Sequence, residues 1–199
     1  MKATIRLANE NDAFQMLSIY APIVRETPTS FEVEPPSEAE FKQRIKDYQK
    51  RLPWLVCELD GEILGYAYAN PHRSRAAYQW SVESSVYVAA KHRKKSVGKA
   101  LYASLFKVLQ VQGFYNVFAG IVLPNPASIA LHEAFGFTLV GVYRAVGYKL
   151  GQWYDVGWWQ LSLQHERSEL VNPPLSWQEV EKLPLWNEAL RSGLNFLRV

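Results

Sequence analysis

The sequence predicts an α/β fold in which helices flank a mixed sheet, partly antiparallel and partly parallel. Strand-like and helical segments follow one another in the order β-α-α-β-β-β-α-β-α-β-β. Asp60-Gly61 indicates a tight hairpin and hence antiparallel neighbours, whereas helices between later strands indicate parallel crossovers. The 199 residues include one cysteine, so the core must form without an intramolecular disulfide.

The first half of the chain contains two helical segments and four strand-like ones. Ser37 followed by Glu40 forms a capping box at the start of the second helix. In chain order, we expect a strand at Thr4–Leu7, a helix from Asn9 or Asn11 through Val24, a helix from Ser37 to about Lys50, and strands at Trp54–Leu59, Ile63–Ala69 and Tyr78–Val88.

The second half alternates helices and strands before a change in character. Gly113 is suited to end a helix, and Asn125-Pro126 is suited to begin one. We expect a helix at Gly98–Gln112, a strand at Tyr115–Val122, a helix from Asn125 to about Phe135, and strands at Phe137–Tyr143 and Trp153–Leu163.

The sequence divides into a domain at residues 1–163 and an extension at residues 164–199. The extension begins with polar residues, and Pro173-Pro174 interrupts the chain. An apolar stripe with helical spacing follows, made by Trp186, Leu190, Leu194 and Leu197. We expect this stripe to dock on the domain or on a second subunit.

Positive charge is concentrated in one segment. The chain has 22 basic and 19 acidic residues, yet Ser84–His132 has six basic residues and no acidic one. This segment contains a strand, a basic turn and a helix start, where free backbone N–H groups favour anions. The pattern indicates a partner with several negative charges, although a solvated basic turn or a nucleic-acid-binding surface would also explain it.

Several classes of protein are disfavoured. Met1–Glu10 lacks the apolar region of a secretory leader, and no apolar run has the length of a membrane span, so we expect a cytoplasmic protein without membrane contact. No His, Asp or Glu group has metal-ligand spacing, so we expect no metal. Cys57 lies in an apolar strand without an adjacent His, which favours a core residue over a nucleophile.

Four motifs follow one another along the chain. Residues 95–100 read Lys-Ser-Val-Gly-Lys-Ala. The others are Val82-Glu83-x-x-Val86-Tyr87-Val88, Leu123-Pro124-Asn125-x-x-Ser128-x-x-Leu131-His132-Glu133 and Gly147-Tyr148-Lys149-x-Gly151-x-Trp153-x-Asp155-Val156-Gly157. Together the four motifs resemble the GNAT acetyltransferases, and specifically the phosphinothricin and methionine sulfoximine N-acetyltransferase branch. In this resemblance, residues 95–100 are similar to the acetyl-CoA pyrophosphate loop, Arg/Gln-x-x-Gly-x-Gly/Ala, with Lys95 at the first position. The resemblance covers about residues 3–163.

The resemblance implies that acetyl-CoA is the cosubstrate and that the acid-free segment binds its phosphates. For Asn125, helix capping is an equally good explanation. The residues implied in acetyl-CoA binding are Val86, Tyr87, Val88, Lys94, Lys95, Ser96, Val97, Gly98, Lys99, Asn125 and Ser128.

The resemblance also implies two catalytic residues. Glu83 corresponds to the family's general base, and a carboxylate within an apolar strand is unfavourable unless it is paired or used. The alternative is an exposed side chain on a half-solvated strand. His132 lies one helical turn after Ser128 and could relay a proton, or it could be an ordinary packed histidine.

A small amino acid or analogue is the acceptor that the resemblance implies. Arginine suits its carboxylate, which favours Arg73 and Arg75, although an arginine in a loop is more often an ordinary surface residue. Phe31, Tyr78 and Tyr143 are candidates for the pocket wall. Another amino acid or small amine remains an alternative acceptor. A nucleic-acid-binding module is disfavoured, because the rest of the chain is acidic. The family also implies a homodimer, which the exposed-looking Trp177 and Trp186 would support.

Overall fold

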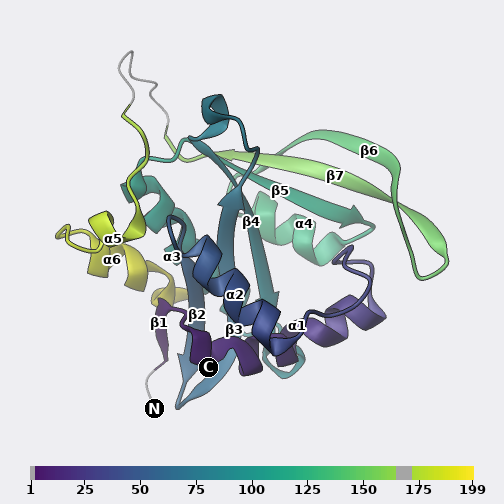
Figure 1. Cartoon of the computed structure of the whole chain (residues 1–199), viewed down its shortest axis with the longest axis horizontal. Coiled ribbons are helices and arrows are strands. Elements are labelled where there is room, and N and C mark those ends of the chain that lie inside the picture. The colour runs from purple at the N-terminus through teal and green to yellow at the C-terminus, as the bar shows by residue number, and fades with distance from the viewer. Residues whose placement is uncertain (1–2, 165–171) are drawn as a thin grey trace.

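A computed structural model describes residues 3–164 and 172–199 of the chain. Seven strands form one twisted sheet in the order β1-β2-β3-β4-β5-β7-β6 (Figure 1). Their bounds are β1 Thr4–Leu7, β2 Trp54–Leu59, β3 Glu62–Pro71, β4 Ser81–Val88, β5 Asn116–Leu123, β6 Thr138–Lys149 and β7 Gln152–Ser162. Of the neighbouring pairs in this sheet, β4–β5 is parallel and the others are antiparallel. The predicted mixed α/β architecture is confirmed.

Helices cover both faces of the sheet. The helices are α1 Ala13–Glu26, α2 Glu38–Tyr48, α3 Val97–Gln112, α4 Pro126–Glu133, α5 Trp177–Val180 and α6 Trp186–Arg191. Side chains of α1 and α2 form one apolar cluster with the sheet, and side chains of α3 and α4 form a second one on the opposite face. Helices α5 and α6 pack beside α3 (Figure 1).

Local sequence signals account for several boundaries of these elements. The Ser37 side chain accepts a hydrogen bond from the Glu40 backbone N–H, and the Glu40 carboxylate accepts one from the Ser37 N–H, as a capping box requires. Gly113 ends α3 with a φ of 93°. Asp60 and Gly61 both have positive φ, 50° and 84°, which matches the tight turn predicted between β2 and β3.

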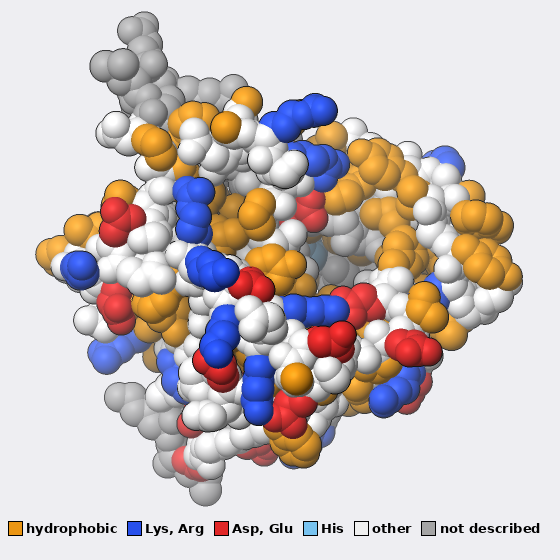
Figure 2. Space-filling model, in the orientation of Figure 1, with side chains coloured by type: hydrophobic (Ala, Val, Ile, Leu, Met, Phe, Trp, Pro, Cys, Tyr) orange, Lys and Arg blue, Asp and Glu red, His pale blue; other side chains and the backbone are white. Residues whose placement is uncertain are grey.

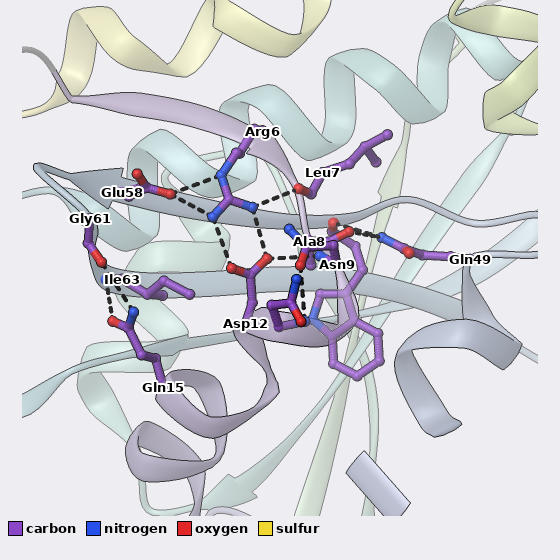
Figure 3. Close-up of polar contacts among 12 residues, drawn as sticks. Arg6, Leu7, Ala8, Asn9, Asp12, Gln15, Gln49, Glu58, Gly61 and Ile63 are labelled. Carbon is purple, nitrogen blue, oxygen red and sulfur yellow. Dashed lines mark hydrogen bonds and ion pairs between the residues drawn. The ribbon is translucent and has the colours of Figure 1, made fainter. Parts of the chain in front are cut away.

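An ion-pair network fastens the N-terminal strand to its neighbours (Figure 3). The Arg6 guanidinium donates to both carboxylate oxygens of Asp12 at 2.8 Å, and its Nε donates to the Glu58 carboxylate at 2.8 Å. The hydrogen bond to Asp12 is the largest contribution to a raised Arg6 pKa. Because Arg6 is on β1, Glu58 on β2 and Asp12 directly before α1, the network fixes the edge of the sheet against α1.

Side chains along β4 alternate between the two apolar clusters. Val82 is buried with α3, whereas Tyr87 packs with Tyr20 of α1. Since alternate residues of a strand share a face, Glu83 lies on the α1–α2 face and Ser84 on the α3–α4 face. Cys57 of β2 lies in the α3 cluster, where burial raises the pKa of its thiol to about 12. It is a core residue, as expected.

Two strands differ from the sequence-based prediction. β4 begins at Ser81 because Ala76–Tyr78 forms a 3₁₀ turn, so the prediction of Tyr78 as a strand residue is wrong. β6 continues to Lys149 and is longer than predicted. A register shift between Tyr143 and Gly147 interrupts its pairing with β7 and hides the regular alternation that marks a strand. The resulting β6–β7 hairpin extends away from the rest of the molecule (Figure 1).

The described part of the extension packs on its own chain. Trp186 is buried with Val108 of α3, and the Trp177 indole donates to the Gln49 carbonyl at 2.5 Å. The prediction that these two tryptophans are exposed is therefore wrong. Residues 165–171, which the predicted extension includes, lie outside the described residues. None of the helices in the described ranges is long and apolar enough to cross a membrane.

Candidate active site

The two parallel strands separate immediately after Glu83. β4 and β5 pair over only three positions, Ser81 with Asn116 through Glu83 with Phe118. Beyond that point β4 keeps its antiparallel partner β3 but has no β5 partner. One edge of β4 is thus open to a ligand, because backbone N–H and C=O groups that lose a strand partner need another one.

A groove of about 650 Å³ lies at the wider end of this opening. Its walls come from the end of β4, the starts of α3 and α4, and α1 with the loop after it. Ten of the eleven residues predicted to bind acetyl-CoA line the groove, and Lys95 does not. The ten are Val86, Tyr87, Val88, Lys94, Ser96, Val97, Gly98, Lys99, Asn125 and Ser128.

The loop before α3 has the geometry of a phosphate site. Lys94 and Ser96 adopt left-handed backbone conformations with φ of 62° and 60°, and such conformations within a loop turn backbone N–H groups into a concave anion site. The first helical hydrogen bond of α3 is donated by the Ala100 N–H to the carbonyl of Ser96, the N-cap residue, at 2.9 Å. The preceding N–H groups of the helix therefore remain for a ligand.

Basic side chains surround the same loop. Arg93, Lys94 and Lys99 line the groove, whereas Lys91 pairs with Glu62 at 2.5 Å. The acid-free segment thus places positive charge beside the free N–H groups, which fits the diphosphate of acetyl-CoA. Asn125 accepts a hydrogen bond from the Ser128 N–H at 3.1 Å, so it caps α4 while lining the groove.

Glu83 is half-buried at the point where the strands separate. Its Oε1 lies 3.0 Å from Nδ1 of His72 and accepts a hydrogen bond from the Arg73 guanidinium at 3.3 Å. The antiparallel register of β3 and β4 explains the contact, because Asn70 is paired with Glu83 and His72 follows two residues later. A carboxylate with these partners can accept a proton from a nearby group.

Aromatic side chains surround Glu83 and its partners. The His72 ring stacks on Phe118 with ring centroids 4.2 Å apart. Trp158 of β7 lies 6.1 Å from the His72 ring and 5.9 Å from the Tyr143 ring, and the Arg73 guanidinium carbon is 5.9 Å from its centroid. One face of the molecule is hollowed between the β6–β7 hairpin and the domain (Figure 2).

The structure brings most of the predicted acceptor residues near Glu83 but not all of them. Arg73 and Tyr143 contact Trp158, and the Tyr78 ring lies 6.0 Å from the His72 ring. Arg75 is known only as a lining residue of a cavity of about 300 Å³ beside this site, which Arg73 and Tyr78 also line. His72, Phe118 and Trp158, which also lie around Glu83, were not predicted from the sequence. The β3–β4 register would have indicated His72, but Trp158 depends on strand order.

Phe31 links the loop after α1 to the β6–β7 hairpin. Its ring lies against Gly147, where any side chain would overlap it. Two residues further along β6, the Lys149 ammonium donates to the Ser30 carbonyl at 2.6 Å, and burial lowers the pKa of Lys149. The hairpin therefore holds Phe31 in place, and the hydrogen bond from Lys149 to the neighbouring Ser30 carbonyl stabilises this contact.

His132 lies on the other face of the sheet from Glu83. It is buried and does not line the groove. Its Nδ1 is 2.7 Å from the Ser128 carbonyl, which can only accept, so Nδ1 carries the proton and Nε2 accepts from the Tyr102 hydroxyl at 3.1 Å. Burial lowers the pKa of His132. Its position thus gives no support to the predicted proton relay.

Among the residues that the structure describes, no group of three or more His, Cys, Asp or Glu side chains is arranged to hold a metal ion.

Comparison with known proteins identifies the family. The model of the Acetyltransferase (GNAT) domain matches residues 5–158. A phosphinothricin N-acetyltransferase of Streptomyces viridochromogenes is 42% identical over 170 residues, which are 85% of this chain and 90% of that protein. An L-methionine sulfoximine/L-methionine sulfone acetyltransferase of Pseudomonas aeruginosa is 36% identical over 171 residues, 84% of this chain and 99% of that protein.

Solved structures agree with this result. The crystal structure of a GNAT superfamily phosphinothricin acetyltransferase from Sinorhizobium meliloti, in complex with acetyl-CoA, has a TM-score of 0.81 and 36% identity. The match covers 89% of this chain and 99% of that one. A putative acetyltransferase from Salmonella typhimurium, solved with its cofactor acetyl-CoA, has a TM-score of 0.82 and 31% identity over 85% and 99% of the two chains. The chain therefore belongs to the GNAT acetyltransferase family and is an acyltransferase that uses acetyl-CoA.

Proposed function

We propose that this protein acetylates the α-amino group of a small amino acid or analogue of the phosphinothricin, methionine sulfoximine or methionine sulfone type, by direct transfer with Glu83 as the general base. The observation that carries the proposal is the position of Glu83. Its carboxylate lies where β4 and β5 separate, next to the opening of the groove and among acceptor-site candidates. The relatives named for these substrates support the acceptor class.

Acetyl-CoA supplies an acetyl group as a thioester. Glu83 accepts a proton from the substrate ammonium, directly or through one water molecule, which frees the nitrogen lone pair for attack on the thioester carbonyl. The open edge of β4 at Val86–Val88 offers backbone N–H groups to the thioester arm and its carbonyl. The new amide bond replaces the carbon–sulfur bond, and coenzyme A leaves as the thiol after it takes up a proton.

The acceptor site suits a zwitterion with a compact polar side chain. Arg73 is half-exposed, and one nitrogen of its guanidinium already contacts Glu83 and the His72 carbonyl. The other nitrogens have no partner among the described residues and can receive the substrate carboxylate. Tyr78, Phe118, Tyr143 and Trp158 supply aromatic walls around that point.

A thiol-release assay on a panel of amino acids tests the proposal. The panel contains phosphinothricin, methionine sulfoximine, methionine sulfone, the standard amino acids, and a polyamine as a cationic control. We expect turnover with one or more of the first three at a kcat/KM at least about tenfold above any standard amino acid. Preferred turnover of the polyamine would contradict the acceptor class. Stabilisation by an oligonucleotide but not by acetyl-CoA in a thermal-shift scan would favour nucleic-acid binding instead.

We also infer that the protein is cytoplasmic. We further infer that it forms a homodimer through the β6–β7 hairpin. Seven large apolar side chains on or between these strands are exposed (Figure 2). They are Leu139, Val140, Tyr143, Val146, Tyr148, Leu150 and Trp153. Exposed apolar groups on this scale mark an interaction surface, and a second copy would cover it. The mass of the protein by light scattering checks the inference, and a monomer would overturn it.

A further inference from the structure

The C-terminal extension runs along the outer side of α3 toward the loop that precedes this helix. Its described part contains α5, α6, a 3₁₀ turn at Ser192–Phe196 and the last three residues. The match to the GNAT domain model ends at residue 158, so the extension lies outside it. Figure 1 shows α5 and α6 on the side of the molecule opposite the β6–β7 hairpin.

The 3₁₀ turn is fixed closely to the first turns of α3. The Ser104 hydroxyl donates to the Leu190 carbonyl at 2.7 Å and accepts from the Gly193 N–H at 3.1 Å. Gly193 lies against the Ala100 carbonyl, where any side chain would overlap backbone atoms. Because this contact is made by backbone atoms on both sides, the turn has little freedom to move along the helix.

The last residues contact both ends of the phosphate-binding segment. The Arg198 N–H donates to the Lys95 carbonyl at 3.2 Å. The Lys99 ammonium lies 4.7 Å from the ring centroid of Phe196, over the ring. Ser96, Val97 and Gly98, which line the groove, lie between Lys95 and Lys99, so the extension is attached on either side of them.

The loop needs such support because its conformation is unfavourable by itself. Lys94 and Ser96 have side chains and yet adopt left-handed conformations, which persist in proteins only when surrounding contacts impose them. The hydrogen bond to Lys95 lies between these two residues. The contact with Phe196 limits the positions available to the Lys99 ammonium, a charge at the rim of the groove.

We propose that residues 196–198 are positioning residues for acetyl-CoA: they hold the loop before α3 in its phosphate-binding conformation and keep Lys99 at its rim. The inference rests on the proposed function, since it assumes that this groove binds acetyl-CoA. It assigns to the extension an effect on cofactor affinity, and none on the acceptor site or on the chemical step. The contacts that hold the loop come from the Arg198 backbone N–H and the Phe196 ring, and the Arg198 charge takes no part in them.

The test compares the full chain with a chain that ends at Asn195. The dissociation constant of acetyl-CoA is measured by calorimetry, and kcat and both KM values by thiol release. We expect the dissociation constant and the KM for acetyl-CoA to rise about tenfold, the combined effect of one hydrogen bond and one cation–π contact. The kcat and the KM for the acceptor should stay within about twofold of the full chain.

Single substitutions test the two contacts separately. They also keep the proposal testable if the truncated chain does not fold. Phe196→Ala, which leaves Gly193 and Leu190 in place, should weaken acetyl-CoA binding about threefold, and Phe196→Trp should restore it. Arg198→Gln keeps the backbone N–H and should bind acetyl-CoA like the wild type. Leu183→Ala alters an exposed side chain elsewhere on the extension and is the matched control.

The outcomes distinguish this inference from the proposed function. A full chain that neither binds acetyl-CoA nor transfers its acetyl group would refute the proposed function, and with it the inference. A full chain with normal activity, whose truncated or Phe196→Ala form binds acetyl-CoA equally well, would overturn only the inference. A fall in kcat without a change in acetyl-CoA affinity would also overturn it, because a positioning role for the cofactor predicts the opposite pattern.

Discussion

The side chains of Glu83 and Ser84, adjacent residues of β4, lie on opposite faces of the sheet, and the two faces differ in character. On the α1–α2 face, Glu83 is a half-buried carboxylate with His72 and Arg73 as partners, at the point where the strands separate. On the α3–α4 face, beyond Ser84, His132 and Tyr102 are buried, hydrogen-bonded to each other and surrounded by apolar side chains. Cys57 belongs to this second face as well.

The difference shows how chemistry and packing are divided in this sheet. A group that takes up protons during turnover must be reached by substrate, and the side chain of Glu83, the proposed base, is partly exposed. A neutral histidine whose two nitrogens are satisfied by a carbonyl and a phenol fixes α4 against α3 instead. Titratable side chains on the first face should therefore control activity, and those on the second should control stability.

The largest expected effect is that of Glu83→Gln. The amide keeps the shape of the side chain but cannot accept a proton at neutral pH, so kcat/KM for the preferred acceptor should fall about 10²- to 10⁴-fold. Acetyl-CoA affinity, measured by calorimetry, should not change. The matched control is Glu38→Gln, which removes an exposed carboxylate paired with Lys42 on α2 and should be fully active. Wild-type turnover by the Glu83 variant would refute its role as the base.

His132 should produce an intermediate effect, on stability. Because burial lowers its folded pKa, the unfolded chain takes up a proton at a higher pH than the native one. The wild-type free energy of unfolding should thus decrease as the pH falls below about 6.5, by at most roughly 1.4 kcal/mol per pH unit from this residue. In His132→Asn this contribution should disappear, and the variant should be about 1–3 kcal/mol less stable at pH 8.

Urea unfolding of both proteins between pH 5 and pH 8, a range set by the ordinary histidine pKa of about 6.5, measures the effect. The same comparison tests the proton-relay prediction. Folded His132→Asn should retain kcat/KM within about tenfold of the wild type, whereas loss of a relay would cost about 10²-fold or more. The division between the faces would be contradicted by two results together. The free energy of unfolding would have the same pH dependence in the wild type and in His132→Asn, and kcat/KM would fall about 10²-fold or more in the variant, as expected of a residue that acts with Glu83.

The smallest effect on activity is expected for Cys57→Ser. Burial makes the thiol a poor nucleophile at neutral pH, and direct transfer does not need it. We expect kcat/KM within about twofold of the wild type, with about 1–3 kcal/mol lower stability because a hydroxyl replaces a buried thiol. Cys57→Ala provides a comparison without the hydroxyl. Loss of activity in both folded variants would indicate a covalent acyl-enzyme route.

Local patterns predicted the secondary structure well, whereas the acceptor site depends on distant parts of the chain. Ser37 and Gly113 marked helix ends because caps involve neighbouring residues only. Glu83 and the loop before α3 could be proposed as site residues because each motif is continuous in sequence. Trp158 was missed because its place beside Arg73 follows from β7 pairing with β5, which no local signal specifies.

The environments of side chains were harder to predict than their positions in helices and strands. Trp186 has the spacing of an amphipathic helix, but spacing cannot reveal which surface the helix covers. His132 occurs in a family motif, yet its burial is set by Tyr102 of α3, thirty residues earlier in the chain. Packing partners of this kind are properties of the assembled fold.

The parallel pairing of β4 with β5 through α3 means that most of the groove proposed to bind acetyl-CoA is encoded in one continuous stretch, from Val86 to Leu131. The proposed acceptor site, by contrast, combines the loop at Phe31, the β3–β4 connection, β5 and the β6–β7 hairpin. Substitutions in those separate segments can change the accepted amine while leaving the cofactor site unaltered. Selection could therefore vary the substrate of such an enzyme independently of its acetyl donor.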